Sequence, residues 1–191
     1  MPQDDQRVLS FENPKKWEAW LAKNHRESTG VWLRMAKKSA AASSVSYAEA
    51  LDVALCYGWI DGQRRSESSE TWLQRFTPRS KRSIWSKINC EKAAALITAG
   101  QMKPAGAAEV ERAKQDGRWN AAYEGRRAEV PDDLAAALER NRKANAFFAR
   151  LDSKNRYAVL FRIHNAKKQE TRERRIAKFV EMLAKGEKLH P

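Results

Sequence analysis

The sequence predicts an α+β protein, predominantly helical, with one small antiparallel sheet of about three strands followed by an all-helical C-terminal module. Two observations lead to this prediction. Most of the 191 residues fall into segments with apolar side chains at helical spacing, and only three short stretches have the β-branched and aromatic character of strands. The composition, with 42% hydrophobic residues, eight Gly and six Pro, is that of a folded globular chain.

Capping residues predict the first two helices. Asn13-Pro14 begins one of them, because Asn caps helix N-termini and Pro suits the first helical position. Ser46 and Glu49 have the spacing of a capping box and begin the next. Gly58 supplies the left-handed residue at which that helix ends.

Three stretches are predicted to form the sheet: 31–35, 59–64 and 71–77. The last two flank the polar string SESS, which indicates a hairpin. Residues 1–10 are expected to be a frayed lead-in outside the sheet.

Further helices are predicted along the rest of the chain. One begins at Ser86 or Asn89 and ends at Gly100, and another runs from Pro104 to near Gly117. After Pro131 every segment has a helical apolar stripe.

The polar stretch 123–130 divides the chain into two predicted parts: a mixed α/β part, 11–122, and a helical module, 130–188. A module of about 60 residues is marginal by itself, so we expect it to dock on the first part.

The net charge of +13 is concentrated in two segments. Residues 64–92 carry eight basic and three acidic side chains, and residues 139–191 carry 15 and six. Such a field attracts anions, so the expected partners are nucleic acid, small anionic ligands, acidic lipid headgroups or acidic proteins.

The sequence predicts a cytoplasmic protein. The N-terminus MPQDDQRVLSFENP has no basic-then-apolar run, and no stretch is long and apolar enough to span a membrane. Cys56 and Cys90 are the only cysteines, which suits a reducing compartment, and both are expected to be small buried hydrophobes.

Motifs of the common enzyme classes are absent from the sequence. It has no G-x-G-x-x-G, G-x-x-x-x-G-K-[ST], H-E-x-x-H or G-x-S-x-G string. The histidines at 25, 164 and 190 are far apart and have no ligand spacing with the cysteines. We therefore predict no metal and no cofactor, and name no catalytic residue.

The densest group of polar and aromatic residues lies between 58 and 89. If the hairpin folds against the following helix, a carboxylate, two arginines and two indoles converge there, and the arginines can hold an anion bidentately. The predicted ligand-binding residues are Trp59, Asp61, Arg75, Arg79, Ser83, Trp85 and Asn89.

A structural alternative explains the same residues without a ligand. Asp61 then pairs with Arg75 or Arg79 across the hairpin, and the indoles close the core. The two hypotheses differ in stability, because removing one partner of a buried pair costs about 3–5 kcal/mol.

Six strings resemble a known family: EALDVALCYGWIDGQ (49–63), RFTPRSKRSIWSKIN (75–89), AGQMKPAGAAEVERAKQDGRW (99–119), VPDDLAAALERN (130–141), AFFARLD (146–152) and AKKQETRERRIAKFVEML (166–183). Over roughly residues 11–186 the chain resembles the YdeI/OmpD-associated family, also called bacteriocin-protection proteins. The resemblance implies a bacterial protein linked to resistance to antimicrobial-peptide or envelope stress. It supplies no catalytic residue.

Three functions follow from these observations. A non-enzymatic binding protein linked to stress resistance is the first. A nucleic-acid binder is the second, and it requires the two basic segments to form one continuous face with exposed aromatic residues. An enzyme acting on a small anionic substrate is the third, and it requires Asp61 and Arg79 to be buried together in a cleft.

Overall fold

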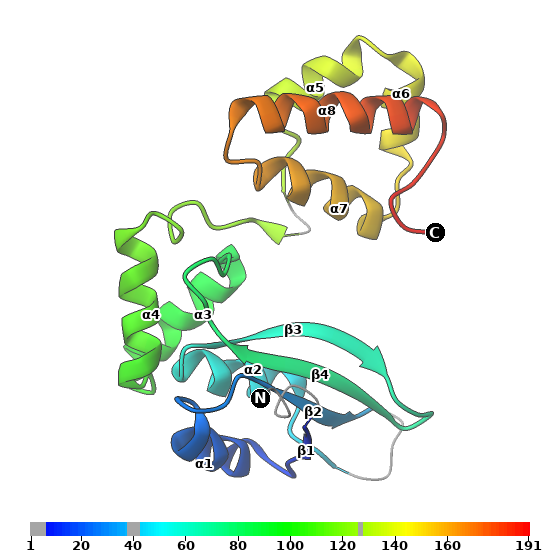
Figure 1. The fold of residues 1–191 in the computed structure, drawn as a ribbon. Coiled ribbons are helices and arrows are strands. Elements are labelled where there is room, and N and C mark those ends of the chain that lie inside the picture. Colours follow the sequence, from blue (N-terminus) through cyan, green and yellow to red (C-terminus); the bar gives the residue numbers. More distant parts are fainter. Residues whose placement is uncertain (1–6, 38–42, 126–127) are drawn as a thin grey trace. The chain divides into compact units, whose positions relative to one another are not determined.

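The computed structural model describes residues 7–37, 43–125 and 128–191 (Figure 1). The described residues divide into two compact units. The first contains the residues up to Trp85 together with Asn89–Ala122, and the second contains Ser86–Ile88 together with Tyr123–Pro191. That the helical module, 130–188, docks on the mixed part, 11–122, stays a prediction.

The first unit contains a four-stranded sheet in the order β1 (Val8–Ser10), β2 (Val31–Ala36), β4 (Thr71–Pro78) and β3 (Trp59–Ser66). The β3–β4 hairpin and the antiparallel pairing of β4 with β2 confirm the predicted strands. The predicted antiparallel sheet of about three strands is confirmed only in part, because β1 adds a fourth strand that pairs with β2 in parallel and makes the sheet mixed.

Strand β1 lies within the residues expected to be a frayed lead-in. It is three residues long and pairs Leu9 with Leu33. A helix separates the two strands, as parallel pairing requires. No turn signal therefore marks this pairing in the sequence.

Two helices begin where their caps predict. Helix α1 (Pro14–Asn24) is capped by Asn13, whose side-chain oxygen accepts a hydrogen bond of 3.0 Å from the backbone N–H of Lys16. Helix α2 (Tyr47–Cys56) has both bonds of the capping box between Ser46 and Glu49. These bonds satisfy N–H groups that have no partner inside a helix.

Helices α1 and α2 supply the core on one face of the sheet. The Trp17 indole of α1 lies 5.8 Å from the ring of Phe76 in β4 and 6.3 Å from that of Trp59 in β3. Its Nε1–H donates to the carbonyl of Ala50 in α2 at 3.1 Å. The buried indole thus has the hydrogen-bond partner that it needs, and it joins both helices to the sheet.

The two faces of the sheet differ in what covers them. Antiparallel partners share a face, so Phe76 lies on the same face as Val31, and Arg75 lies on the same face as Trp32. Val31 and Phe76 belong to the main core cluster, whereas Trp32 does not. Arg75 and Trp32 are therefore on the face opposite the helix-bound core.

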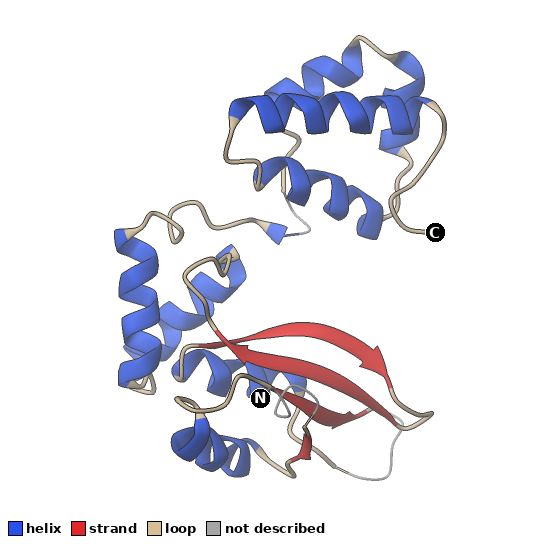
Figure 2. Cartoon of the chain, viewed as in Figure 1, coloured by secondary structure: helices blue, strands red, loops and turns tan. Residues whose placement is uncertain are grey.

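Helices α3 (Lys87–Thr98) and α4 (Pro104–Gln115) complete the elements that follow the sheet (Figure 2). Gly106 of α4 lies against the end of α2, where an added Cβ would be 2.3 Å from the carbonyl oxygen of Cys56. Only glycine fits at this approach. A glycine at 106 therefore allows the two helix ends to touch.

The described residues of the second unit form four helices: α5 (Asp132–Glu139), α6 (Arg142–Ala149), α7 (Ser153–His164) and α8 (Gln169–Ala184). Their apolar stripes meet in a second core of Leu134, Leu138, Ala144, Phe148, Val159, Leu160, Ile163, Ile176, Phe179 and Leu183. The predicted helical character of this part is confirmed within residues 128–191.

Candidate functional site

The candidate site is built on the turn that follows β4. The backbone N–H of Arg79 donates to the carbonyl of Gly58 at 2.9 Å, which anchors the turn to the end of α2. The turn is closed by Ser80 and Ser83, since the N–H of Ser80 donates to the Ser83 hydroxyl at 2.9 Å. These bonds fix the backbone of Ser83 and Ile84, whose carbonyls then face two arginines.

Arg79 is held in a fixed position. Its side chain is buried, with 5% of the residue exposed, and its guanidinium carbon lies 3.6 Å from the ring centre of Trp85. Its Nη1–H donates to the carbonyl of Ile84 at 3.2 Å. A stacked plane and one hydrogen bond together orient the guanidinium.

The remaining edge of the Arg79 guanidinium is unusual. Among the described residues, its Nε and Nη2 are buried and have no hydrogen-bond partner. These two atoms form the edge that holds a carboxylate bidentately elsewhere in the chain. Arg34 binds Glu67 through Nε and Nη2 at 2.7 and 2.6 Å, and Arg172 binds Asp133 through the same pair of atoms at 2.5 and 2.8 Å.

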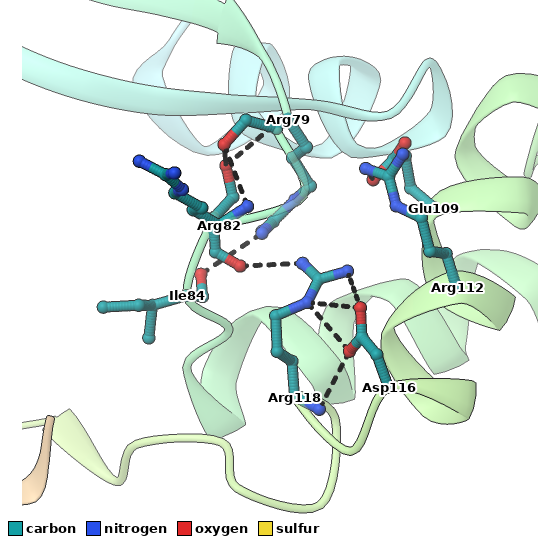
Figure 3. Close-up of polar contacts among 9 residues, drawn as sticks. Arg79, Arg82, Ile84, Glu109, Arg112, Asp116 and Arg118 are labelled. Carbon is teal, nitrogen blue, oxygen red and sulfur yellow. Dashed lines mark hydrogen bonds and ion pairs between the residues drawn. The ribbon is translucent and has the colours of Figure 1, made fainter. Parts of the chain in front are cut away.

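A second arginine approaches the same turn. Arg118 lies in the turn after α4 and donates from Nη1 to the carbonyl of Ser83 at 2.9 Å (Figure 3). Asp116 balances its charge through an ion pair of 2.7 Å. Two guanidiniums are therefore bound to consecutive carbonyls, and only Arg118 has a carboxylate partner.

A third arginine lies on α4. Arg112 forms an ion pair with Glu109, and its buried Nε has no hydrogen-bond partner among the described residues. Figure 3 shows this pair on the far side of Arg79 from Ile84. Glu109 thus adds a second carboxylate, beside Asp116, to the surroundings of Arg79.

Burial disfavours the charged form of the Arg79 guanidinium. Its pKa is lowered to about 10, first because burial removes water from the guanidinium, and further because Arg118 repels it. Cys90, Glu109 and Asp61 act in the opposite direction. Arg79 still carries its charge at neutral pH, and an added anion would lower the cost of that charge.

The thiol beside this arginine is not activated. Burial raises the pKa of Cys90 to about 11, and the nearby charge of Arg79 only partly offsets this effect. The thiolate is the nucleophilic form of cysteine. At neutral pH Cys90 is therefore a protonated, unreactive thiol.

The structure brings some of the seven predicted residues together. Arg79 stacks on Trp85, and Ser83 contributes its carbonyl and its hydroxyl to the turn between them. Asn89 lies in the first turn of α3, four residues beyond Trp85. These four come from one stretch of chain, residues 79–89.

The other three predicted residues lie elsewhere in the first unit. Trp59 is buried in the core, where its Nε1–H donates to the carbonyl of His25 at 3.2 Å. Asp61 accepts a hydrogen bond of 2.8 Å from the Tyr47 hydroxyl. Burial of the ring, and after it this bond, raises the pKa of Tyr47.

The alternation of side chains along β3 and β4 places Asp61 and Arg75 on opposite faces of the sheet. Asp61 faces Phe76 across the hairpin, so it shares the helix-covered face, whereas Arg75 points to the opposite face. Arg75 lies 5.8 Å from the ring of Trp32 on that face. The proposed pairing of Asp61 with Arg79 is also not formed among the described residues, because Arg79 binds the Ile84 carbonyl instead.

Sequence reasoning missed Arg118, Arg112 and Glu109. They lie about 25–40 residues beyond the turn, and no local motif connects them to it. Asp116-Gly117-Arg118 has the form of a turn after a helix, which gave no sign of a contact with Ser83. Only the tertiary fold brings this segment to the site.

A groove of about 480 Å³ also opens on the first unit, and none of the seven predicted residues lines it. Two of its carboxylates are paired, Glu18 with Lys103 at 2.9 Å and Asp52 with Lys92 at 2.6 Å. Its lining residues are Pro14, Lys15, Glu18, Glu49, Asp52, Val53, Cys56, Leu96, Gly100, Gln101 and Lys103.

Two further features concern metals and membranes. Within residues 7–37, 43–125 and 128–191, no three His, Cys, Asp or Glu side chains are grouped as metal ligands. In the same ranges, none of the helices has the length and apolar character to cross a bilayer.

The chain thus combines a unit built on a mixed sheet, with a buried arginine beside it, and a helical unit. It belongs to the family described as Domain of unknown function (DUF8412), whose model matches residues 9–109, more than half of the chain. Residues 127–186 match the family described as Bacteriocin-protection, YdeI or OmpD-Associated, which confirms the resemblance seen in the sequence for this part of the chain. No curated protein and no solved structure matches the chain.

Proposed function

We propose that this chain is a non-enzymatic binding protein that captures an oxyanion, a carboxylate or a phosphate group, on the Nε–Nη2 edge of Arg79. The observation that carries the proposal is that this edge is buried and has no partner among the described residues. Leaving a buried donor without a partner costs about 1–3 kcal/mol, and more when the donor is charged. A bound oxyanion removes that cost.

The arrangement around Arg79 suits such a ligand. Trp85 fixes the plane of the guanidinium, and the Ile84 carbonyl occupies Nη1, so the free edge is oriented in advance. Arg118 adds a second positive charge. Because arginine presents two parallel N–H groups to planar or tetrahedral oxyanions, the expected ligand binds with both oxygens on this edge.

Two observations support binding over catalysis. Asp61, the carboxylate that an enzyme at this site would require, is engaged with Tyr47. The nearest thiol, Cys90, is protonated at neutral pH. The groups around Arg79 therefore suit recognition of charge more than proton transfer or nucleophilic attack.

The second unit supports a place for this binding in stress resistance. Its family is described as bacteriocin-protection. We infer that anion capture by the first unit serves such protection. Deleting the gene in its host and measuring survival under bacteriocin exposure tests this link, and complementation with an Arg79→Lys gene connects it to the site.

Calorimetry on the purified full chain tests the binding itself, with inorganic phosphate, sulfate, acetate and citrate as probes. Arg79→Lys keeps the charge but loses the bidentate edge, so we expect at least a roughly tenfold weaker affinity for the anion that binds. Arg34→Lys is the matched control, because the same edge of Arg34 is filled by Glu67.

Two outcomes contradict the proposal. One is that Arg79→Lys binds the anion as tightly as the unaltered chain. The other is that none of the four probes binds at all.

A further inference from the structure

The edge strand β3 carries two arginines that face opposite sides of the sheet. β3 is the last strand in the order β1-β2-β4-β3, so within the described part of the chain one side of it has no neighbouring strand (Figure 1). Arg64 and Arg65 are consecutive on it and are paired with Gln74 and Leu73 of β4. Consecutive residues of a strand point to opposite faces, so the two guanidiniums flank the edge.

Each of these arginines is stacked on a tryptophan. Arg64 lies 4.0 Å from the ring centre of Trp72, and Arg65 lies 4.3 Å from that of Trp32. The two indoles belong to opposite faces of the sheet, as the register of β2 and β4 requires. Stacking holds both guanidinium planes, and neither guanidinium has a hydrogen bond or an ion pair among the described residues, while the charge of Glu67 acts on Arg65 from a longer distance.

The surrounding basic groups are already engaged. Arg34 is held by Glu67, and Lys37 donates to the carbonyl of Ser68 at 2.6 Å. Arg64 and Arg65 are both exposed, in contrast with the buried Arg79. They are thus two oriented cations at one sheet edge that are ready to contact an external anion.

We propose that this edge binds double-stranded nucleic acid by entering a groove of the duplex. A groove has a row of phosphates along each wall, and arginines on both faces of an inserted edge meet both rows. The major groove is about 12 Å wide and admits a two-stranded β-ribbon, so the end of the β3–β4 hairpin that carries both arginines fits in it. A flat membrane surface can contact the arginines of only one face, so the duplex is the better match.

This inference is independent of the oxyanion site, because Arg79 plays no part in it. It assigns the chain a non-specific contact with phosphates. Base edges are read by hydrogen bonds from side chains that reach the floor of a groove, and the stacked arginines point to its walls. The expected binding is therefore insensitive to base sequence and strongly dependent on salt.

Fluorescence anisotropy tests the proposal with the full chain and a short labelled duplex over a series of KCl concentrations. We expect Arg64→Ala/Arg65→Ala to weaken duplex binding at least roughly tenfold and to lower the salt slope by about 2, since each phosphate contact contributes about 0.9. Arg26→Ala/Lys23→Ala is the matched control, because it removes two exposed positive charges elsewhere in the first unit. It should change the affinity less than about twofold.

Other probes identify a wrong partner. A single strand of the same sequence and vesicles containing phosphatidylserine are measured beside the duplex. Tighter binding to either than to the duplex overturns the groove model. Equal losses in the two double variants overturn it as well, because they reduce the effect to net charge.

A structural role for the same arginines gives a different result. Charged side chains on an edge strand also prevent sheets from pairing edge to edge. If the Arg64→Ala/Arg65→Ala chain self-associates in size-exclusion chromatography and keeps its duplex affinity, the only role of the arginines is to prevent edge-to-edge pairing. Arg64→Lys/Arg65→Lys keeps both positive charges at the edge strand, so this variant should remain unassociated and still lose part of the duplex affinity.

Discussion

Replacing Arg79 by Met separates a ligand site from a structural charge. Methionine fills much of the same volume and is apolar, so it stays in contact with Trp85 without a charge. The structure shows one hydrogen bond from this guanidinium, to the Ile84 carbonyl, and no carboxylate partner for it among the described residues. The substitution therefore leaves no buried carboxylate without its cation.

The expected change in stability follows from opposing contributions. Burial lowers the pKa of Arg79 from the ordinary value of an arginine to about 10, which at about 1.4 kcal/mol per pKa unit is a cost of about 3 kcal/mol for holding the charge in the folded state. Removing the charge abolishes that cost. It also loses a cation–π contact of about 1–2 kcal/mol and a charged hydrogen bond of about 1.5–3 kcal/mol. The net change in the free energy of unfolding is thus within about 2 kcal/mol of zero.

The same pKa gives the sign of a pH dependence. The folded pKa of about 10 lies below the ordinary value that arginine has in the unfolded chain, so between these two pKa values the unfolded chain binds more protons. Stability then rises with pH over this window as far as Arg79 contributes to it. The stability of the unaltered chain relative to Arg79→Met should therefore increase from pH 10 upward.

Denaturant unfolding followed by tryptophan fluorescence measures the effect. All seven tryptophans lie in the first unit, so the signal reports the unit that holds Arg79. A loss of about 3–5 kcal/mol would be the result expected for a broken buried ion pair. Such a loss would refute the view that Arg79 lacks a structural partner, and with it the reason for expecting a ligand.

Three other outcomes are expected. Gly106→Ala should destabilise the chain by about 1–3 kcal/mol, because the added methyl group overpacks the contact between α4 and α2. The control is Ala108→Gly on the exposed side of the same helix, which should cost about 1 kcal/mol through the lower helix propensity of glycine alone. A Gly106→Ala chain that is more stable in denaturant unfolding would contradict the close helix contact. Burial raises the pKa of both Cys56 and Cys90 to about 11, so Ellman's reagent at mildly alkaline pH should label neither thiol until denaturant unfolds the chain. The bidentate hydrogen bond from Arg34 lowers the pKa of Glu67 to about 2, so the stability that this pair adds should be present above pH 4.5 and be lost as pH falls toward 2. A carboxyl NMR titration of Glu67 with a midpoint near 4.5 would show that the pair is not formed in solution.

Local chemistry predicted much of the fold. The Asn13 cap, the capping box at Ser46 and the left-handed Gly58 each lie where the structure places a helix end. These signals concern residues within four positions of one another, and each satisfies a backbone group that the helix leaves unpaired. Strand β1 had no such signal, because it pairs with β2, which follows it in the sequence only after a helix.

The candidate site was less predictable, for two physical reasons. The register of strand pairing determines which side chains share a face of the sheet. A difference of one residue in register puts Asp61 and Arg75 on opposite faces. Tertiary folding supplies Arg118, which no pattern links to Ser83. The contact between Arg79 and Trp85 could be predicted from the sequence. The two residues are six positions apart on either side of a turn that follows a proline, so local geometry brings them together.

Salt separates the two binding proposals in a single preparation. Arg79 is buried and its edge is shielded from counterions, so a bidentate oxyanion there should lose little affinity as KCl increases. Arg64 and Arg65 are exposed, and duplex binding through them releases counterions, so it should weaken steeply over the same range. If the affinities for phosphate and for duplex fall in parallel, both ligands are held by the general positive field of a chain with a net charge of +13, and neither local arrangement of arginines is the reason for binding.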